Sequence, residues 1–370
     1  MALAAVGSGL VSVIIPTFDR REAVCAAVRS VLEQTYAHLE AIVVDDGSTD
    51  GTAQAISDLA GADPRVTLVR RPRGGVAAAR NTGLARARGE LIAFLDSDDV
   101  WLSFKLELQL ACLRRLPQVG MIWTEMRALD AGGRPRPGSS LRDILTFRHQ
   151  PEEIFSHSIS LDELPQLPPP AAGGTLRWGD IYRELVLGNL VLPSSALLTR
   201  ERLALVGGFD DSLKVAGEDF DFFLRVAREG EVAFVDVATV LKQTGRADQL
   251  TDRSRQLQLA RNYLTTLEAA LARDPERLDA GRAEVRASRA HAHRWIAQSA
   301  LESGQRALAR SHLRRALRLE GARPRSLALL GLVALPAPLS RTALAAATSL
   351  LGRLRRLAAR LLRARSQVRR

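Results

Sequence analysis

LIAFLDSDDVW, residues 91–101, joins an apolar run to a cluster of acidic residues. The apolar part is typical of a strand that is buried on both faces. It ends in an Asp-Ser-Asp-Asp sequence, in which Asp96 and Asp98 alternate and can point at one position from an extended backbone. Two neighbouring carboxylates suit a hard divalent cation, Mg²⁺ or Mn²⁺, which takes oxygen ligands. The alternative interpretation is an acidic turn that caps a helix beginning near Trp101.

Strand and helix patterns alternate from the N-terminus to about residue 125. Buried-strand patterns cover residues 11–18, 41–48, 66–71 and 91–95, and amphipathic-helix patterns cover residues 21–35, 52–60 and 75–87. Alternation with short turns predicts an α/β fold with a Rossmann-like, mostly parallel central sheet covered by helices. In sheets of this kind, ligands bind beyond the carboxyl ends of the strands.

Polar residues follow three of these strands at the end where ligands would bind. They are Pro16, Thr17 and Asp19 after the first strand, Asp45 and Asp46 after the second, and Asp96 and Asp98 after the fourth. Lying side by side, these strand ends would form one acidic pocket that suits a metal ion. The Asp-Asp-Gly-Ser sequence also suits a tight turn, so turn formation remains an alternative role for Asp45 and Asp46.

The composition indicates a globular protein whose basic charge lies at one end. The 370 residues are 46% hydrophobic and 25% charged, enough for one large domain and a smaller one. Residues 341–370 contain nine arginines and no acidic residue, so the rest of the chain carries +2 of the net charge of +11. Cys25 and Cys112 have no partner spacing for zinc or a disulfide framework, which fits a cytoplasmic protein. No secretory signal is evident and no apolar run reaches about 20 residues, so we expect no membrane span.

Residues 130–175 differ in composition from the segments around them. They are rich in Pro, Gly and Ser and show little periodicity, which predicts a long excursion of the kind that often covers an active site. An inert insertion is the alternative. Regular patterns resume at residue 178. Farther along, they predict a helix that begins at Gly217-Glu218-Asp219 and a strand at residues 232–237. We therefore expect a first domain of residues 1–245. It would consist of a first half (1–125), the excursion (126–177) and a second half (178–245).

Helical patterns cover the chain from about residue 250, and we expect residues 246–370 to form a helical C-terminal region. Residues 290–319 resemble one tetratricopeptide-type helical hairpin around Gly304. A single unit cannot bury its own apolar face, so the hairpin should pack on the domain before it. His291 and His293 are two positions apart and face different sides of a helix, which argues against a metal site there.

The arginine-rich tail has the pattern of a basic amphipathic helix. Leu350, Leu354, Leu357 and Leu361 form one stripe, and arginines lie mostly on the other side. Such a helix can lie in the interface of an anionic membrane, which predicts peripheral contact with the inner face of the membrane. A helix docked on its own domain and a disordered tail are the alternatives. We expect no nucleic-acid partner, because no aromatic platform or groove-reading motif accompanies the arginines.

Four sequence blocks occur in the order and spacing of one enzyme family. They are VSVIIPTFDR, VVDDGSTDGT, GGVAAARNTGLARARGELIAFLDSDDVW and SSALLTRERLALVGGFDDSLKVAGEDFDFFLRVA, within about residues 10–240. The chain therefore resembles the family 2 glycosyltransferases, which have the GT-A fold. The resemblance implies inverting transfer of one sugar from a nucleotide-diphosphate sugar, with UDP favoured, to a hydroxyl of a sugar or lipid-linked glycan. It also implies a role in cell-envelope or exopolysaccharide assembly.

The resemblance also implies roles for individual residues. Those that would bind the nucleotide-sugar are Pro16, Thr17, Asp19, Asp46, Arg80 and Asp96, among which Asp46 would hydrogen-bond the base. Asp98, together with Asp96, would hold Mn²⁺ or Mg²⁺ at the diphosphate. Asp219 would be the catalytic base, with Glu218 as its neighbour. From the residues alone, Arg80 could equally lie on a helix surface, and Glu218 and Asp219 could simply cap a helix.

Two departures from the family pattern and two competing functions bear on this interpretation. No QxxRW motif is present, which favours transfer of single sugars. The basic segment often found after the catalytic base is represented only by residues 241–251, where Lys242 or Arg246 could contact phosphate. A sugar-phosphate nucleotidyltransferase is excluded, because no glycine-rich loop follows the first strand. The remaining alternative is a non-catalytic, glycosyltransferase-like protein that acts through its helical C-terminus.

Overall fold

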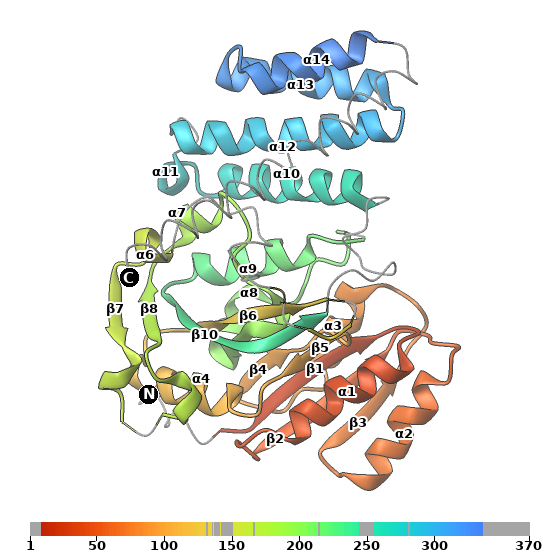
Figure 1. Cartoon of the computed structure of the whole chain (residues 1–370), viewed down its shortest axis with the longest axis vertical. Coiled ribbons are helices and arrows are strands. Elements are labelled where there is room, and N and C mark those ends of the chain that lie inside the picture. The colour runs from red at the N-terminus through yellow and green to blue at the C-terminus, as the bar shows by residue number, and fades with distance from the viewer. Residues whose placement is uncertain are drawn as a thin grey trace. The chain divides into compact units, whose positions relative to one another are not determined.

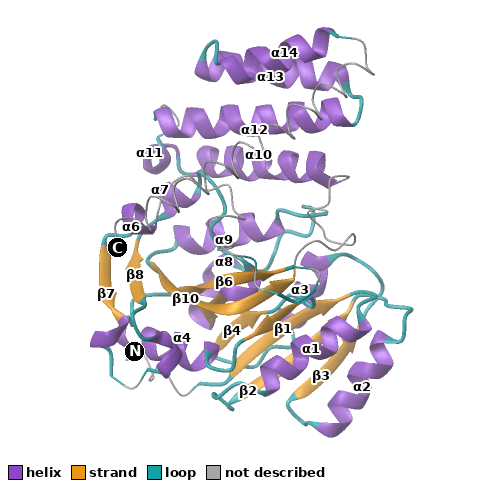
Figure 2. Cartoon of the chain, in the orientation of Figure 1, coloured by secondary structure: helices purple, strands orange, loops and turns teal. Residues whose placement is uncertain are grey.

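The structure is a computed structural model in which the chain forms two compact units, Met1–Arg273 and Asp274–Arg370. It describes residues 9–130, 132–134, 136, 141, 151–165, 167–213, 215–243, 255–279 and 282–335. Arg246 and the arginine-rich tail lie outside the described residues. Figures 1 and 2 show the two units by element and by secondary structure, and each unit is described by itself below.

The first part of the chain has the predicted alternation of strands and helices. The elements are β1 (Val11–Thr17), α1 (Arg21–Leu32), β2 (Leu39–Asp45), α2 (Thr52–Ala62), β3 (Val66–Arg70), α3 (Val76–Leu84) and β4 (Leu91–Phe94). Every residue of β1, β2 and β4 is buried, which explains why these strands are mainly apolar. Helices α1 and α2 lie against each other, and α3 packs on β1 and β2 (Figure 1).

One ten-stranded sheet forms the centre of the first unit (Figure 2). Its order is β3-β2-β1-β4-β9-β6-β10-β8-β7, and β5 pairs with β10 off this path. The added strands are β5 (Asp99–Trp101), β6 (Met121–Leu129), β7 (His157–Ser160), β8 (Thr175–Gly179), β9 (Ala196–Thr199) and β10 (Val232–Gln243). Strands β3, β2, β1 and β4 are parallel, whereas β9 joins β4 and β6 in antiparallel fashion. The predicted Rossmann-like sheet is confirmed, with a mixed second half.

Helices cover the sheet, and one of them carries a cluster of aromatic side chains. The remaining helices of this unit are α4 (Lys105–Arg115), α6 (Pro151–Ile154), α7 (Tyr182–Leu185), α8 (Arg200–Val206), α9 (Glu218–Arg228) and α10 (Gln256–Arg273). Phe222 of α9 stacks on Phe209 with ring centroids 4.1 Å apart, and Phe94 of β4 meets both rings edge-on. This packing brings the start of α9 to the carboxyl end of β4, because aromatic rings dominate the area buried there.

Part of the predicted excursion at residues 126–177 is regular structure. Strands β7 and β8 pair with each other, and β8 pairs with β10, so that they form one end of the sheet. Backbone hydrogen bonds between strands stabilise β7 and β8, and such bonds leave little trace in side-chain periodicity. Residues 137–140 and 142–150 lie outside the described residues, so the idea that this segment covers the active site stays a prediction.

The described part of the second unit is helical, as predicted. It contains α11 (Pro275–Leu278), α12 (Ala283–Glu302), α13 (Arg306–Glu320) and α14 (Pro324–Ala334). The predicted hairpin is the pair α12 and α13, which is joined at Gly304 with a φ of +78° that suits glycine. Its packing on the first unit stays a prediction. Among the helices that the structure describes, none is long and apolar enough to cross a membrane.

Acid should destabilise the α12–α13 hairpin through a buried pair of histidines. The Nδ1 atoms of His293 and His312 lie 2.9 Å apart, and His293 is 6% exposed. Burial, with His312, Arg315 and Arg289 adding to it, lowers the pKa of His293 to about 4. The folded hairpin therefore favours the neutral ring, and its stability is present above the unfolded pKa of about 6.5 and is lost as the pH falls toward 4.

Thermal melts at pH 7 and pH 4 test this prediction. Between pH 7 and pH 4, the free energy of unfolding should fall in both proteins. We expect the fall in His293→Leu to be smaller than that in the wild type by about 2–3 kcal/mol. The control is His291→Leu, on the same helix, which should follow the wild type. Parallel losses in the wild type and His293→Leu would contradict the prediction.

Candidate active site

The polar residues that follow β1, β2 and β4 lie at one edge of the sheet. The three strands are parallel neighbours, so their carboxyl ends coincide. The N–H of Asp46 donates to the carbonyl of Thr17 at 2.9 Å, which joins the ends of β1 and β2. The Thr17 hydroxyl is buried and has no hydrogen-bond partner in the described part of the chain. Pro16 is buried in β1, where it pairs with Val44. The predicted convergence is therefore present.

The two acids after β2 have different roles. Asp45 is fully buried and accepts the N–H of Ser48 at 2.9 Å, which is turn chemistry. Asp46 faces the other way and accepts the N–H groups of Gly74 and Gly75, at 3.0 and 2.7 Å. Arg71 adds an ion pair with Asp46 at 2.5 Å. The turn interpretation thus applies to Asp45, and Asp46 lies against the loop that precedes α3.

Asp19 ties the loop after β1 to the loop after β2. Its backbone lies in the left-handed region with a φ of +47°. Its N–H donates to the hydroxyl of Ser48 at 2.9 Å, and its carboxylate accepts the N–H of Thr49 at 2.8 Å. Asp19 is exposed, so it stands at the rim of the pocket rather than at its base.

Arg80 joins the two halves of the first unit at the site. Only 3% of Arg80 is exposed, so the alternative of a surface helix residue is wrong. It donates to Glu218 Oε1 at 2.6 Å and to Asp96 Oδ1 at 2.8 Å. Burial alone would lower the pKa of Arg80, but Asp96 and Glu218 outweigh it and raise the pKa. The planar guanidinium thus holds an acid after β4 and an acid of α9 together.

Each acid of the turn after β4 has a partner from elsewhere in the fold. Asp98 forms an ion pair with Arg20 at 2.9 Å. Asp99 accepts the hydroxyl of Ser194 at 2.6 Å and lies 3.5 Å from the ammonium of Lys242. Strand β5 follows this turn, and α4 begins only at Lys105 without a side-chain cap. The interpretation of the turn as a helix cap near Trp101 is therefore wrong.

The charges around this turn separate the pKa values of its acids. Burial alone would raise the pKa of Asp96, but Arg80 and Lys242 outweigh it and lower the pKa. Burial raises the pKa of Asp99 to about 7 against the attraction of Lys242. Asp96 is therefore ionised at neutral pH and can serve as a ligand or hydrogen-bond acceptor, whereas Asp99 lies behind it.

Asp219 lies in the first turn of α9, next to Glu218. Its Oδ1 accepts the N–H of Phe220 at 2.8 Å, and its Oδ2 accepts the amide of Asn189 at 3.2 Å. Burial and the charge of Glu218 raise the pKa of Asp219 to about 7. Glu218 pairs with Arg80 instead of capping α9, whose N-cap residue is Gly217 with a φ of +96°. A carboxylate with a pKa near neutrality is suited to general base catalysis.

Three residues that complete the site were missed in the sequence. Arg20 pairs with Asp98, Ser194 contacts the turn after β4, and Asn189 contacts Asp219. The carbonyl oxygen of the Asn189 side chain accepts the N–H of Val191 at 3.0 Å, which points its amide nitrogen toward Asp219. No spacing signal could have found these residues, because their partners lie far along the chain.

The acidic turn fits a metal ion that is completed by substrate. Searching the described residues finds no group of three or more His, Cys, Asp or Glu side chains that could enclose a metal. Asp96 and Asp98 offer carboxylate oxygens at the turn, and Mg²⁺ commonly binds one or two carboxylates plus substrate phosphates and water. The donor set therefore suits an open site rather than a closed cage.

Residues 12–155 match the family model described as Glycosyl transferase family 2. These residues belong to the family 2 glycosyltransferases. The match covers the part of the chain that carries Asp46, Arg80, Asp96 and Asp98, and it ends before Asp219.

Curated relatives match about 100 residues of the chain. The chain is 43% identical over 105 residues to UDP-Glc:alpha-D-GlcNAc-diphosphoundecaprenol beta-1,3-glucosyltransferase WfgD of Escherichia coli, covering 28% of this chain and 41% of the relative. It is 47% identical over 102 residues to the putative teichuronic acid biosynthesis glycosyltransferase TuaG of Bacillus subtilis, covering 27% and 40%. The aligned part thus spans about two fifths of the length of these relatives.

Solved structures show the same fold for the glycosyltransferase domain. One is S. aureus TarS 1-349 in complex with UDP-GlcNAc, with a TM-score of 0.50 and 18% identity, covering 87% of this chain and 90% of that one. Another is the mannosyltransferase PcManGT from Pyrobaculum calidifontis in complex with GDP-Man and Mn²⁺, with a TM-score of 0.50 and 20% identity, covering 91% and 84%. The GT-A fold is confirmed.

Proposed function

We propose that the chain transfers one sugar from a nucleotide-diphosphate sugar to a hydroxyl of a glycan acceptor, with inversion at the anomeric carbon. The observation that carries the proposal is Asp219, a carboxylate with a pKa of about 7 that lies beside the acids joined by Arg80. Such a group is ionised often enough at neutral pH to accept a proton and basic enough to hold it.

The nucleotide-sugar would bind along the carboxyl ends of β1, β2 and β4. Thr17, with its unpartnered hydroxyl, and Asp46 would hold the nucleoside, with Pro16 and Asp19 shaping the pocket. A carboxylate can accept the imide N–H of uracil, and UDP-sugars are named for WfgD and bound in the TarS complex. A UDP-sugar is therefore the favoured donor, which Asp96 would hold through the ribose or the sugar.

A divalent cation, Mn²⁺ or Mg²⁺, would bind at Asp98 and Asp96 with the donor diphosphate. PcManGT was solved with Mn²⁺. When bound, the metal neutralises the charge that grows on the leaving diphosphate. Arg20 and Lys242 already lie beside Asp98 and Asp99, so they add positive charge at the same place.

Asp219 would act as the base in a single displacement. It takes the proton of the acceptor hydroxyl as the hydroxyl oxygen bonds to the anomeric carbon and the bond to the diphosphate breaks. Glu218 stays paired with Arg80, which keeps a second negative charge close and the pKa of Asp219 high. The names of WfgD and TuaG favour a lipid-linked or cell-envelope glycan as the acceptor.

Thermal melting with UDP, GDP or dTDP, each with Mn²⁺ or EDTA, tests the donor site. A ligand at about 100 times its Kd stabilises the folded state by about 2.7 kcal/mol. We expect a metal-dependent rise in Tm with one nucleotide, absent in Asp98→Ala and present in Asp58→Ala, an acid on the exposed side of α2. No shift and no nucleotide-sugar hydrolysis would contradict the proposal and favour a non-catalytic protein that acts through its C-terminal helices.

Asn189 should set the pH dependence of the reaction. Its amide donates to Asp219, which favours the ionised carboxylate. We expect Asn189→Ala to raise the pKa of Asp219 and to move the rising limb of kcat/KM to higher pH by about one unit. Gln34→Ala removes another buried amide, which bonds the carbonyls of Ser30 and Leu102, and should leave the limb in place. Equal profiles for Asn189→Ala and the wild type would contradict the prediction.

A further inference from the structure

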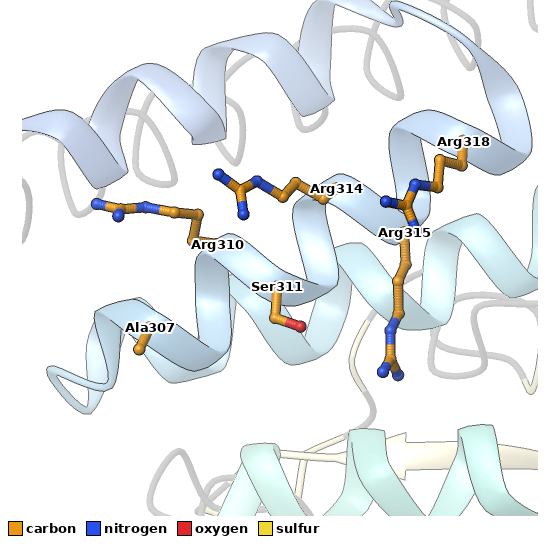
Figure 3. A pocket seen from close by; sticks show the side chains of 6 residues that line it. All are labelled: Ala307, Arg310, Ser311, Arg314, Arg315 and Arg318. Carbon is orange, nitrogen blue, oxygen red and sulfur yellow. The ribbon is translucent and has the colours of Figure 1, made fainter.

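Helix α13 carries a face of exposed arginines in the second unit. Arg310, Arg314 and Arg318 repeat every fourth residue and are exposed. On an α-helix this spacing places them along one side, with steps of about 6 Å. Figure 3 shows Arg310 and Arg314 extending in the same direction, whereas Arg315 extends away from them. We call Arg310, Arg314 and Arg318 the arginine face.

The arginine face has no internal counter-charge. In the part of the chain that the structure describes, none of its three guanidinium groups forms a hydrogen bond or an ion pair. Arg294, by contrast, is paired with Glu320. Residues 274–335 contain 12 arginines and six acidic residues, so this part of the chain has a positive net charge that adds to the potential of the face.

Small side chains keep the arginine face accessible. Ala307 lies one turn before Arg310, Ser311 lies between Arg310 and Arg314, and both line a surface hollow with the arginines (Figure 3). Guanidinium groups bind phosphate oxygens in pairs of hydrogen bonds, so the hollow suits phosphate groups presented from outside. No aromatic residue lines the hollow, which disfavours stacking on nucleic-acid bases.

The apolar side of α13 is buried against neighbouring helices. Ala309, Leu313 and Ala316 are buried, and α13 packs on α12 and α14. The helix therefore has no apolar stripe left to insert between lipid tails, and its contact with a membrane would be electrostatic.

We propose that the arginine face docks the chain on an anionic phospholipid membrane. The choice of partner rests on the proposed function, because a lipid-linked acceptor is held at a membrane surface. The lipid phosphates supply the negative charge that the face lacks. This surface is distinct from the arginine-rich tail, which lies outside the described residues.

Vesicle co-sedimentation of the full chain tests the proposal. The vesicles contain phosphatidylcholine, with one lipid in three replaced by phosphatidylglycerol. Each arginine near such a surface contributes roughly fivefold to binding, so the triple change of Arg310, Arg314 and Arg318 to Gln should weaken binding by more than about tenfold. The tail is present in every protein compared, so its contribution is common to all of them.

A matched triple variant controls for the loss of charge. Arg29, Arg86 and Arg115 are exposed on helices and loops of the first unit, and their change to Gln removes the same charge. This control should bind within about twofold of the wild type, and wild-type binding should fall steeply between about 0.05 M and 0.5 M salt. Thermal melting of both triple variants verifies that they are folded.

Three outcomes would overturn the proposal. They are unchanged vesicle binding by the arginine-face variant, equal losses in the two triple variants, and binding of the face to single-stranded DNA but not to vesicles. Binding is measured without nucleotide, so a failure of the proposed sugar transfer leaves this result interpretable.

Discussion

Asp219→Asn is expected to lower the rate of sugar transfer by about 10²–10⁴-fold, the usual contribution of general base catalysis. The change keeps the shape of the side chain and removes the oxygen that would take the proton. It also removes a charge that lies beside Glu218 in a buried site, so stability should be kept or increased. Turnover of the nucleotide-sugar with acceptor, together with the Tm, measures both effects.

Asp221→Asn is the matched control for this change. Asp221 lies in the same turn of α9, two residues on, and forms an ion pair with Arg225 at 2.9 Å instead of facing the site. It should change the rate by less than about threefold, because its pair is partly exposed and weak. A similar loss in both variants would indicate that the changes damage α9. Full activity of Asp219→Asn would show that another residue is the base.

The wild-type rate should also rise with pH through about 7. The pKa of Asp219 is raised to about 7 by burial and by Glu218, so the protonated form dominates below that value and cannot act as a base. The rising limb of kcat/KM reports this pKa in the free enzyme, and Asp219→Asn should remove the limb. A limb that persists in the variant would assign the titration to another group.

Arg80→Leu is expected to lower the free energy of unfolding by about 3–5 kcal/mol, because it leaves the buried Glu218 and the half-buried Asp96 without their shared cation. Glu218 is 4% exposed and pairs with Arg80, and Asp96 shares the same guanidinium. Arg228→Leu is the control, since Arg228 pairs with Glu229 at a partly exposed position, and it should cost about 0–1 kcal/mol.

A second change separates lost charge pairing from lost packing. Adding Glu218→Gln to Arg80→Leu removes one of the stranded carboxylates and should recover part of the stability. Chemical denaturation of the wild type, both single variants and the double variant gives the coupling free energy. Additive losses, or an Arg80→Leu protein as stable as the wild type, would contradict the role of Arg80 as the charge that joins the two halves.

Much of the first half of the fold could be predicted from local patterns. Strands β1, β2 and β4 are buried along their whole length, so most of their residues are apolar, and that signal is visible in the sequence. Because the strands could be located in this way, the sequence also predicted that the acids after them lie at one edge of the sheet. Strands β7 and β8 were missed because they are four and five residues long and depend on pairing, β7 with β8 and β8 with β10.

Local sequence patterns specify the order of strands and helices, the polar residues at the strand ends and the acids at the start of α9. Which cation neutralises which acid depends on the packing of segments that are distant in the chain. Arg80 reaches Glu218 across 138 positions, and Lys242 reaches Asp99 across 143. Contacts of this length depend on how the sheet is completed, and local periodicity holds no record of them. The pKa of Asp219, and with it the chemistry that we propose, follows from that packing because burial and neighbouring charges set it.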